Sequence, residues 1–131
     1  MIVLDAAALV DVLTDQPTAP WVLEQIDNTP ICAPGHQPAE VLSAIARLVR
    51  AGVLDDSSAR EAVLEASALH QELVPVSEGL LLRAFDLAGR IRVLDGLYVA
   101  LAEGRGARLV TTDHRLARAQ LPVPVDAPGG P

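Results

Sequence analysis

Short apolar runs alternate along the chain with longer segments in which apolar residues recur every three or four positions. The runs predict strands at residues 2–4, 31–33, 73–76, 108–111 and 123–125. The third and the fifth of these strands are expected at the edges of the sheet. The periodic segments predict helices at residues 6–13, 20–26, 37–51, 57–72, 77–88, 95–103 and 113–119. Strands separated by helices favour right-handed crossovers and a parallel sheet with helices on both faces. The pattern therefore predicts an α/β fold.

Chain length and composition favour one globular domain. The 131 residues are 50% hydrophobic, which suits a single core, and we expect the domain to span residues 1–126 and a disordered tail residues 127–131. No apolar stretch approaches the length of a membrane span. The start of the chain lacks the basic residues of a signal peptide, and Asp5 interrupts its apolar run. We therefore expect a cytoplasmic protein without a membrane segment. Cys32 is the only cysteine, which excludes an internal disulfide.

The charged residues are unusual in type as well as in balance. Seventeen acids against ten bases give a net charge of −7, which argues against a broad basic surface for nonspecific nucleic-acid binding. All ten bases are arginine. The absence of lysine excludes a Walker A loop and a response-regulator receiver site with its usual lysine.

Four acids fall at predicted strand ends or helix starts. Asp5 and Asp113 each follow a predicted strand directly, although they lie at opposite ends of the chain. Asp95 opens a predicted helix, and Glu40 lies in the first turn of the long helix after the second strand. Ligand sites of parallel sheets lie beyond the carboxyl ends of the strands, so the fold would bring these acids to one edge.

Each acid also has an ordinary structural explanation. Asp95 and Asp113 are suitable helix N-caps, because a short carboxylate accepts hydrogen bonds from the free amides of the first turn. The helical wheel places Glu40 away from the apolar face, as expected of a solvated acid. Asp5 is harder to explain in this way, because apolar residues flank it on both sides and an unpaired buried carboxylate is costly.

A cluster of four carboxylates would repel itself unless a cation neutralised it or one member kept its proton. Hard oxygen ligands suit Mg²⁺ or Mn²⁺. Such an ion lowers the pKa of an attacking water and stabilises the extra negative charge of a phosphoryl transition state. The acids therefore favour metal-assisted chemistry on a phosphate ester.

In their order and separation, three stretches of the chain resemble a PIN-domain ribonuclease of the VapC toxin type. The three stretches are IVLDAAALVDVL, PGHQPAEVLSAIARLVRAGVL and VLDGLYVALAEGRGARLVTTDHRLA. The resemblance covers nearly the whole chain. It implies a PIN-like three-layer α/β sandwich with a short, mainly parallel central sheet, which cleaves RNA with Mg²⁺ or Mn²⁺, forms a homodimer and is neutralised by a cognate antitoxin. The implied catalytic and metal-binding acids are Asp5, Glu40, Asp95 and Asp113, with Thr111 as the supporting hydroxyl.

Two positions depart from the family pattern. Ala7 stands where a serine or threonine is common, which removes one hydroxyl that would orient Asp5. Gly96 replaces the more usual alanine after Asp95, at small expected cost near a helix start. Neither change removes a metal ligand.

The sequence thus predicts a metal-dependent endoribonuclease acting as a toxin. Arg47 and Arg115 are possible contacts for RNA phosphates, although solvated surface arginines would look the same. Tyr98 is expected in the core. One alternative is a catalytically silent PIN-like domain that binds RNA or a partner, which Ala7 favours. The other is a phosphatase, against which the absence of an Asp-x-Asp pattern after the first strand argues.

Overall fold

The structure, a computed structural model, describes residues 1–129. The strands are β1 (Ile2–Leu4), β2 (Ile31–Pro34), β3 (Glu72–Val74), β4 (Arg108–Val110) and β5 (Val125–Asp126). The helices are α1 (Ala6–Leu13), α2 (Ala19–Ile26), α3 (Gln37–Arg50), α4 (Asp56–Ala68), α5 (Glu78–Asp86), α6 (Val93–Arg105) and α7 (His114–Arg118).

The strands form one parallel sheet in the order β3-β2-β1-β4-β5. Ile2 of the central strand is in register with Ile31 on one side and Arg108 on the other. Because every strand runs in the same direction, all five carboxyl ends lie at one edge. The predicted parallel α/β class is confirmed, and β3 and β5 are edge strands as expected.

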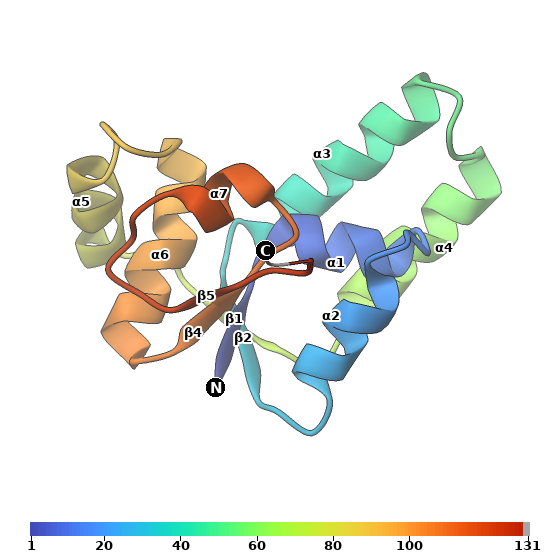
Figure 1. Cartoon of the computed structure of the whole chain (residues 1–131). Coiled ribbons are helices and arrows are strands. Elements are labelled where there is room, and N and C mark those ends of the chain that lie inside the picture. The colour runs from blue at the N-terminus through green and yellow to red at the C-terminus, as the bar shows by residue number, and fades with distance from the viewer. Residues whose placement is uncertain (130–131) are drawn as a thin grey trace.

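Helices cover both faces of this sheet (Figure 1). One face carries α6, against which α5 packs, and the other carries α1 and α2. The helices α3 and α4 pack together as an antiparallel hairpin that extends from the body of the molecule (Figure 1). This arrangement gives the three layers that the sequence analysis expected.

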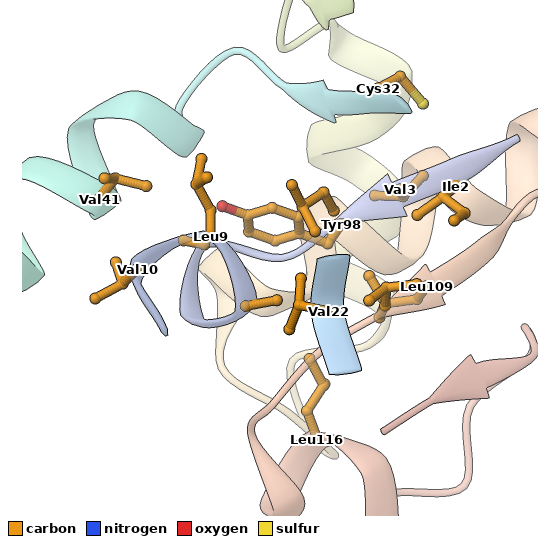
Figure 2. Close-up of a cluster of buried hydrophobic side chains, with 14 of the residues drawn as sticks. Ile2, Val3, Leu9, Val10, Val22, Cys32, Val41, Tyr98, Leu109 and Leu116 are labelled. Carbon is orange, nitrogen blue, oxygen red and sulfur yellow. The ribbon is translucent and has the colours of Figure 1, made fainter. Parts of the chain in front are cut away.

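The core lies where α1 and α6 meet the central strand. All three residues of β1 are fully buried, which explains why this strand reads as an uninterrupted apolar run. Tyr98 of α6 is also fully buried, as predicted, and its ring lies among aliphatic side chains that include Leu9 and Val3 (Figure 2).

Several element boundaries differ from the sequence predictions. The helix α6 begins at Val93, so Asp95 lies within its first turn rather than opening it. The helix α4 ends at Ala68 because the chain turns there to place Glu72 in β3. The last strand starts at Val125, after Pro124, which lacks the N–H that a ladder bond requires.

No helix among residues 1–129 is long and apolar enough to cross a membrane. Of the predicted tail, residues 127–129 follow β5 as a turn, and residues 130 and 131 lie outside the described residues. The disorder of the tail stays a prediction.

Candidate active site

The four acids singled out in the sequence line one cavity at the carboxyl edge of the sheet. Asp5, Glu40, Asp95 and Asp113 all contribute to its wall, and its volume is about 320 Å³. The same wall includes the three arginines 47, 92 and 115. The fold therefore brings together side chains from four separate segments of the chain.

Asp5 lies at the deepest point of this constellation. It follows β1 directly and is only 4% exposed. The Thr111 hydroxyl donates a hydrogen bond of 2.7 Å to Asp5 Oδ2, and Thr111 Oγ1 in turn accepts one of 3.0 Å from the backbone N–H of Asp113. Thr111 therefore connects the first acid to the segment that carries the fourth, and it supplies the orienting hydroxyl that Ala7 lacks.

Burial raises the pKa of Asp5 to about 7, against an ordinary value of 3.8. The hydrogen bond from Thr111 opposes this rise, whereas the negative charges of Asp95, Glu40 and Asp113 add to it. These carboxylates are thus close enough to repel one another. The cluster relieves the repulsion in part by keeping a proton on Asp5 near neutral pH.

Glu40 is held by the buried Tyr98 and the partly buried His36. Tyr98 donates a hydrogen bond of 2.9 Å to Glu40 Oε1, and His36 Nε2 lies 3.2 Å from the same oxygen. The His36 ring packs at a tilt on the Tyr98 ring, with centroids 4.9 Å apart. The alternative that Glu40 is an ordinary solvated acid is therefore wrong.

These contacts also determine the ionisation of Glu40. Burial alone would raise its pKa, but the hydrogen bonds from His36 and Tyr98 outweigh burial and hold the pKa below its usual value. His36 Nε2 also lies 3.2 Å from the carbonyl oxygen of Leu94, so both neighbours are acceptors and Nε2 carries the hydrogen. Glu40 is consequently an ionised carboxylate at neutral pH.

Asp95 is paired with Arg92, a residue that the sequence analysis did not identify. Arg92 Nε donates to Asp95 Oδ2 at 3.0 Å and its Nη2 donates to Oδ1 at 2.9 Å. Arg92 itself occupies the N-cap position of α6, so the explanation of Asp95 as an N-cap is wrong. The sequence signal for this ion pair was the spacing of three positions, because residues three apart lie on the same side of a helix.

Asp113 does cap a helix, as the ordinary explanation proposed. Its Oδ1 accepts a hydrogen bond of 2.9 Å from the backbone N–H of Arg115 at the start of α7. The Arg115 side chain adds two further bonds, from Nε to Oδ1 at 3.3 Å and from Nη2 to Oδ2 at 3.1 Å. These bonds outweigh the effect of burial and lower the pKa of Asp113.

Arg47 lines the cavity from α3 without an acidic partner among the residues described. Its Nη1 donates a 3.2 Å hydrogen bond to Ser43 Oγ, one turn earlier. The side chain is exposed, so it is accessible to an incoming ligand.

The donor set of this cavity suits a hard divalent cation. The four carboxylates that line it offer only oxygen. Burial is the main cause of the raised pKa of Asp5, and the negative charges of the other acids, which a cation would neutralise, add to the rise. Among residues 1–129, however, no three such side chains already converge as a coordination shell. In this structure Arg92 and Arg115 instead bond both oxygens of Asp95 and of Asp113.

The fold and the cavity together define a small α/β protein with an acidic site at the carboxyl edge of a parallel sheet. Residues 2–121 match the family model of the PIN domain. The chain belongs to the PIN domain family, in its VapC group, as the resemblance indicated.

Individual relatives agree with this membership. The chain is 41% identical over 125 residues to Ribonuclease VapC3 of Mycobacterium tuberculosis, an alignment covering 90% of this chain and 86% of that protein. It is 36% identical over 118 residues to Ribonuclease VapC12 of the same organism, covering 90% and 91%. A solved toxin-antitoxin complex from Klebsiella pneumoniae contains a chain of the same fold, with a TM-score of 0.70, 15% identity and 98% coverage of each chain.

Proposed function

We propose that this protein is a divalent-metal-dependent endoribonuclease that acts as the toxin of a toxin–antitoxin pair. The observation that carries the proposal is the meeting of Asp5, Glu40, Asp95 and Asp113 around one cavity. The names of the curated relatives, which are ribonucleases, support RNA as the substrate. A cytoplasmic location remains a prediction.

Asp5, Asp95 and Asp113 would hold Mg²⁺ or Mn²⁺, directly or through water, and Glu40 would position a second ion or orient the attacking water. The ion would supply an activated water and charge stabilisation at the phosphate. Thr111 holds Asp5 in place through the bond to Oδ2. Both hydrogen bonds to Glu40 end on Oε1, so its Oε2 is the oxygen that would orient the attacking water or accept its proton.

The cleavage test uses purified protein and total cellular RNA, with fragment ends mapped by sequencing. We expect defined fragments with Mn²⁺ or Mg²⁺ and intact RNA after addition of a chelator. Asp95→Asn should lose activity, because it removes a charged ligand from the cavity. Asp86→Asn is the matched control, since this acid is exposed on α5 outside the cavity, and it should cleave normally. Intact RNA with both metals would contradict the proposal.

The second candidate function is a catalytically silent domain that binds RNA or a partner. The observation favouring it is the pairing of Asp95 with Arg92 and of Asp113 with Arg115, because each arginine bonds both oxygens of its carboxylate. In this case RNA would stay intact and would bind with the same affinity before and after metal removal. The cleavage test therefore separates the two functions.

The antitoxin partner is proposed to bind the groove between α3 and α4. This opening, of about 640 Å³, is lined mainly by aliphatic side chains, including Leu42, Val49 and Val63, with Arg50 and Arg60 among its lining residues. Its volume and composition suit the apolar face of an amphipathic segment. A second apolar surface, formed by Leu81, Leu82 and Phe85 on α5, is proposed as the homodimer contact.

A further inference from the structure

Two arginines make the same kind of contact with neighbouring acids of the cavity. Arg92 and Arg115 each direct a planar guanidinium at a carboxylate, and each forms bonds to both of its oxygens. This geometry is the strongest form of a hydrogen-bonded ion pair, because two parallel bonds restrain position and orientation together. Both arginines line the cavity that holds all four acids.

The pairs are asymmetric in their exposure to solvent. The side chains of Asp95 and Asp113 are 11% and 19% exposed, whereas those of Arg92 and Arg115 are 60% and 72% exposed. The acids are therefore fixed in the wall, and the arginines reach over them from the solvent side. Either guanidinium can swing outward without disrupting the core.

The carboxylate oxygens bound by these arginines are the ones that a divalent ion would need. An ion and a guanidinium cannot occupy the same lone pairs at once, so the two compete. Without an ion, the arginines offset the repulsion among the acids. The burial of Asp95 and Asp113 makes such compensation necessary, since an unpaired buried charge is costly.

We propose that Arg92 and Arg115 are displaceable counterions of the acidic cavity. They hold Asp95 and Asp113 until a divalent ion replaces them, and they then face the RNA phosphate from the rim. The inference rests on the proposed function and assigns two positioning residues to it. It also describes how the acids become free to bind an ion: only the two exposed arginine side chains would have to move away from them.

A third bidentate pair provides a matched control. Arg83 Nε donates to Glu103 Oε1 at 2.7 Å and its Nη2 donates to Oε2 at 3.1 Å, which is the same geometry between α5 and α6. Neither residue lines the cavity. Arg83→Gln thus removes an equivalent ion pair without changing competition at the proposed metal site.

The test measures Mn²⁺ binding by titration calorimetry on the metal-free protein and its Arg92→Gln, Arg115→Gln and Arg83→Gln variants. We expect the first two to bind Mn²⁺ about fivefold more tightly than wild type, or about 1 kcal/mol, because the competing cation is gone. Both should also melt at a lower temperature without metal. Arg83→Gln should keep the wild-type affinity. A role in structure alone would leave Mn²⁺ affinity unchanged or weaken it.

The phosphate contact is tested separately with Ca²⁺-loaded protein and a single-stranded RNA oligonucleotide. Arg92→Gln and Arg115→Gln should bind this RNA several-fold more weakly, and Arg83→Gln should bind it like wild type. If a glutamine variant does not fold by circular dichroism, Arg92→Lys replaces it. Lysine keeps the charge but loses the two parallel bonds, so its Mn²⁺ affinity should also exceed that of wild type.

The outcomes separate this inference from the function on which it rests. If wild type binds Mn²⁺ and cleaves RNA while both glutamine variants retain its Mn²⁺ affinity, the counterion role is overturned and the nuclease function stands. If wild type binds no Mn²⁺, the metal-dependent function itself fails. Unchanged RNA affinity in both variants would overturn the phosphate contact.

Discussion

At the scale of single residues, the environment of each acid matters more than its identity. Asp5 follows β1 directly and Asp113 follows β4 after two threonines, yet burial raises the pKa of the first, whereas the bonds from Arg115 lower that of the second. The difference arises from partners. Asp5 has a neutral hydroxyl from Thr111, and Asp113 has a guanidinium and a backbone amide.

The raised pKa of Asp5 predicts that Asp5→Asn stabilises the metal-free protein near neutral pH. Between pH 3.8 and about 7 the folded protein keeps a proton that the unfolded chain has lost, so the free energy of unfolding falls as pH rises through this window. The full shift corresponds to at most about 4 kcal/mol. Asparagine removes the charge and can still accept the Thr111 hydrogen bond. Thermal melts at pH 5 and pH 8 measure the effect.

At pH 8 the Asp5→Asn protein should melt roughly 5 °C or more above wild type, and the gap should narrow at pH 5. Asp113→Asn is the control of opposite sign, because the lowered pKa of Asp113 means that its charge stabilises the fold. An Asp5→Asn protein that melts at or below the wild-type temperature at pH 8 would contradict the argument.

At the scale of elements, the packing of α5 on α6 positions Asp95. A Cβ added at Gly96 would lie 3.2 Å from Cα and Cβ of Ala84 and 3.3 Å from its carbonyl oxygen. Ala84 is fully buried on α5. The glycine that departs from the family pattern therefore has a packing reason here, since it lets the two helices approach closely next to Asp95.

Gly96→Ala should consequently destabilise the protein by about 1 kcal/mol. Crowding against the backbone of α5 costs on the order of 1–3 kcal/mol, and the better helix propensity of alanine recovers at most about 1 kcal/mol. Urea unfolding measures the difference. Gly104→Ala in the same helix is the control, because nothing lies within 4 Å of its added Cβ, and it should be stabilising. Equal stabilisation by both substitutions would disprove the packing role.

Element boundaries show where sequence patterns lose resolution. The periodicity placed a helix at residues 95–103, but α6 starts at Val93 and ends at Arg105. The two extra residues at the start are apolar and exposed, so they gave no amphipathic signal. This small shift changes the interpretation of Asp95 from a cap to a first-turn residue paired with Arg92.

At the scale of the whole molecule, two apolar surfaces lie apart from the acidic cavity. Leu42 in the groove between α3 and α4 is 54% exposed, and Phe85 on α5 is 74% exposed. The two lie on different helical layers, on opposite sides of the sheet (Figure 1). Exposed aliphatic and aromatic side chains of this size are typical of contact surfaces.

The variants Leu42→Glu and Phe85→Glu should therefore fail in different ways. Leu42→Glu should no longer copurify with a coexpressed antitoxin, yet it should keep the mass of the proposed dimer by light scattering. Phe85→Glu should lose the proposed dimer and keep the coexpressed antitoxin. Each variant is the control for the other, since a charge on an exposed site costs little folding stability. Retention of both interactions by both variants would remove these surface assignments.

The sequence by itself determined the layout of the fold. Alternating strands and helices favour parallel strands. Parallel strands place Asp5 and Asp113 at the carboxyl edge of the sheet, whatever the conformation of the loops. Such conclusions depend on chain direction and periodicity, which are local properties. They predicted the layers, the edge strands and the gathering of the acids.

Only the tertiary structure decided the long-range contacts of the acids. One of the two partners of Glu40 is Tyr98, 58 positions away, and the partner of Asp5 is Thr111, 106 positions away, so periodicity could not reveal either bond. Only the family resemblance implied a role for Thr111. Burial, which keeps the proton on Asp5, is likewise a property of the packed molecule. Hydrogen bonds and desolvation depend on distances of a few ångströms between remote segments, and these distances exist only after the chain has folded.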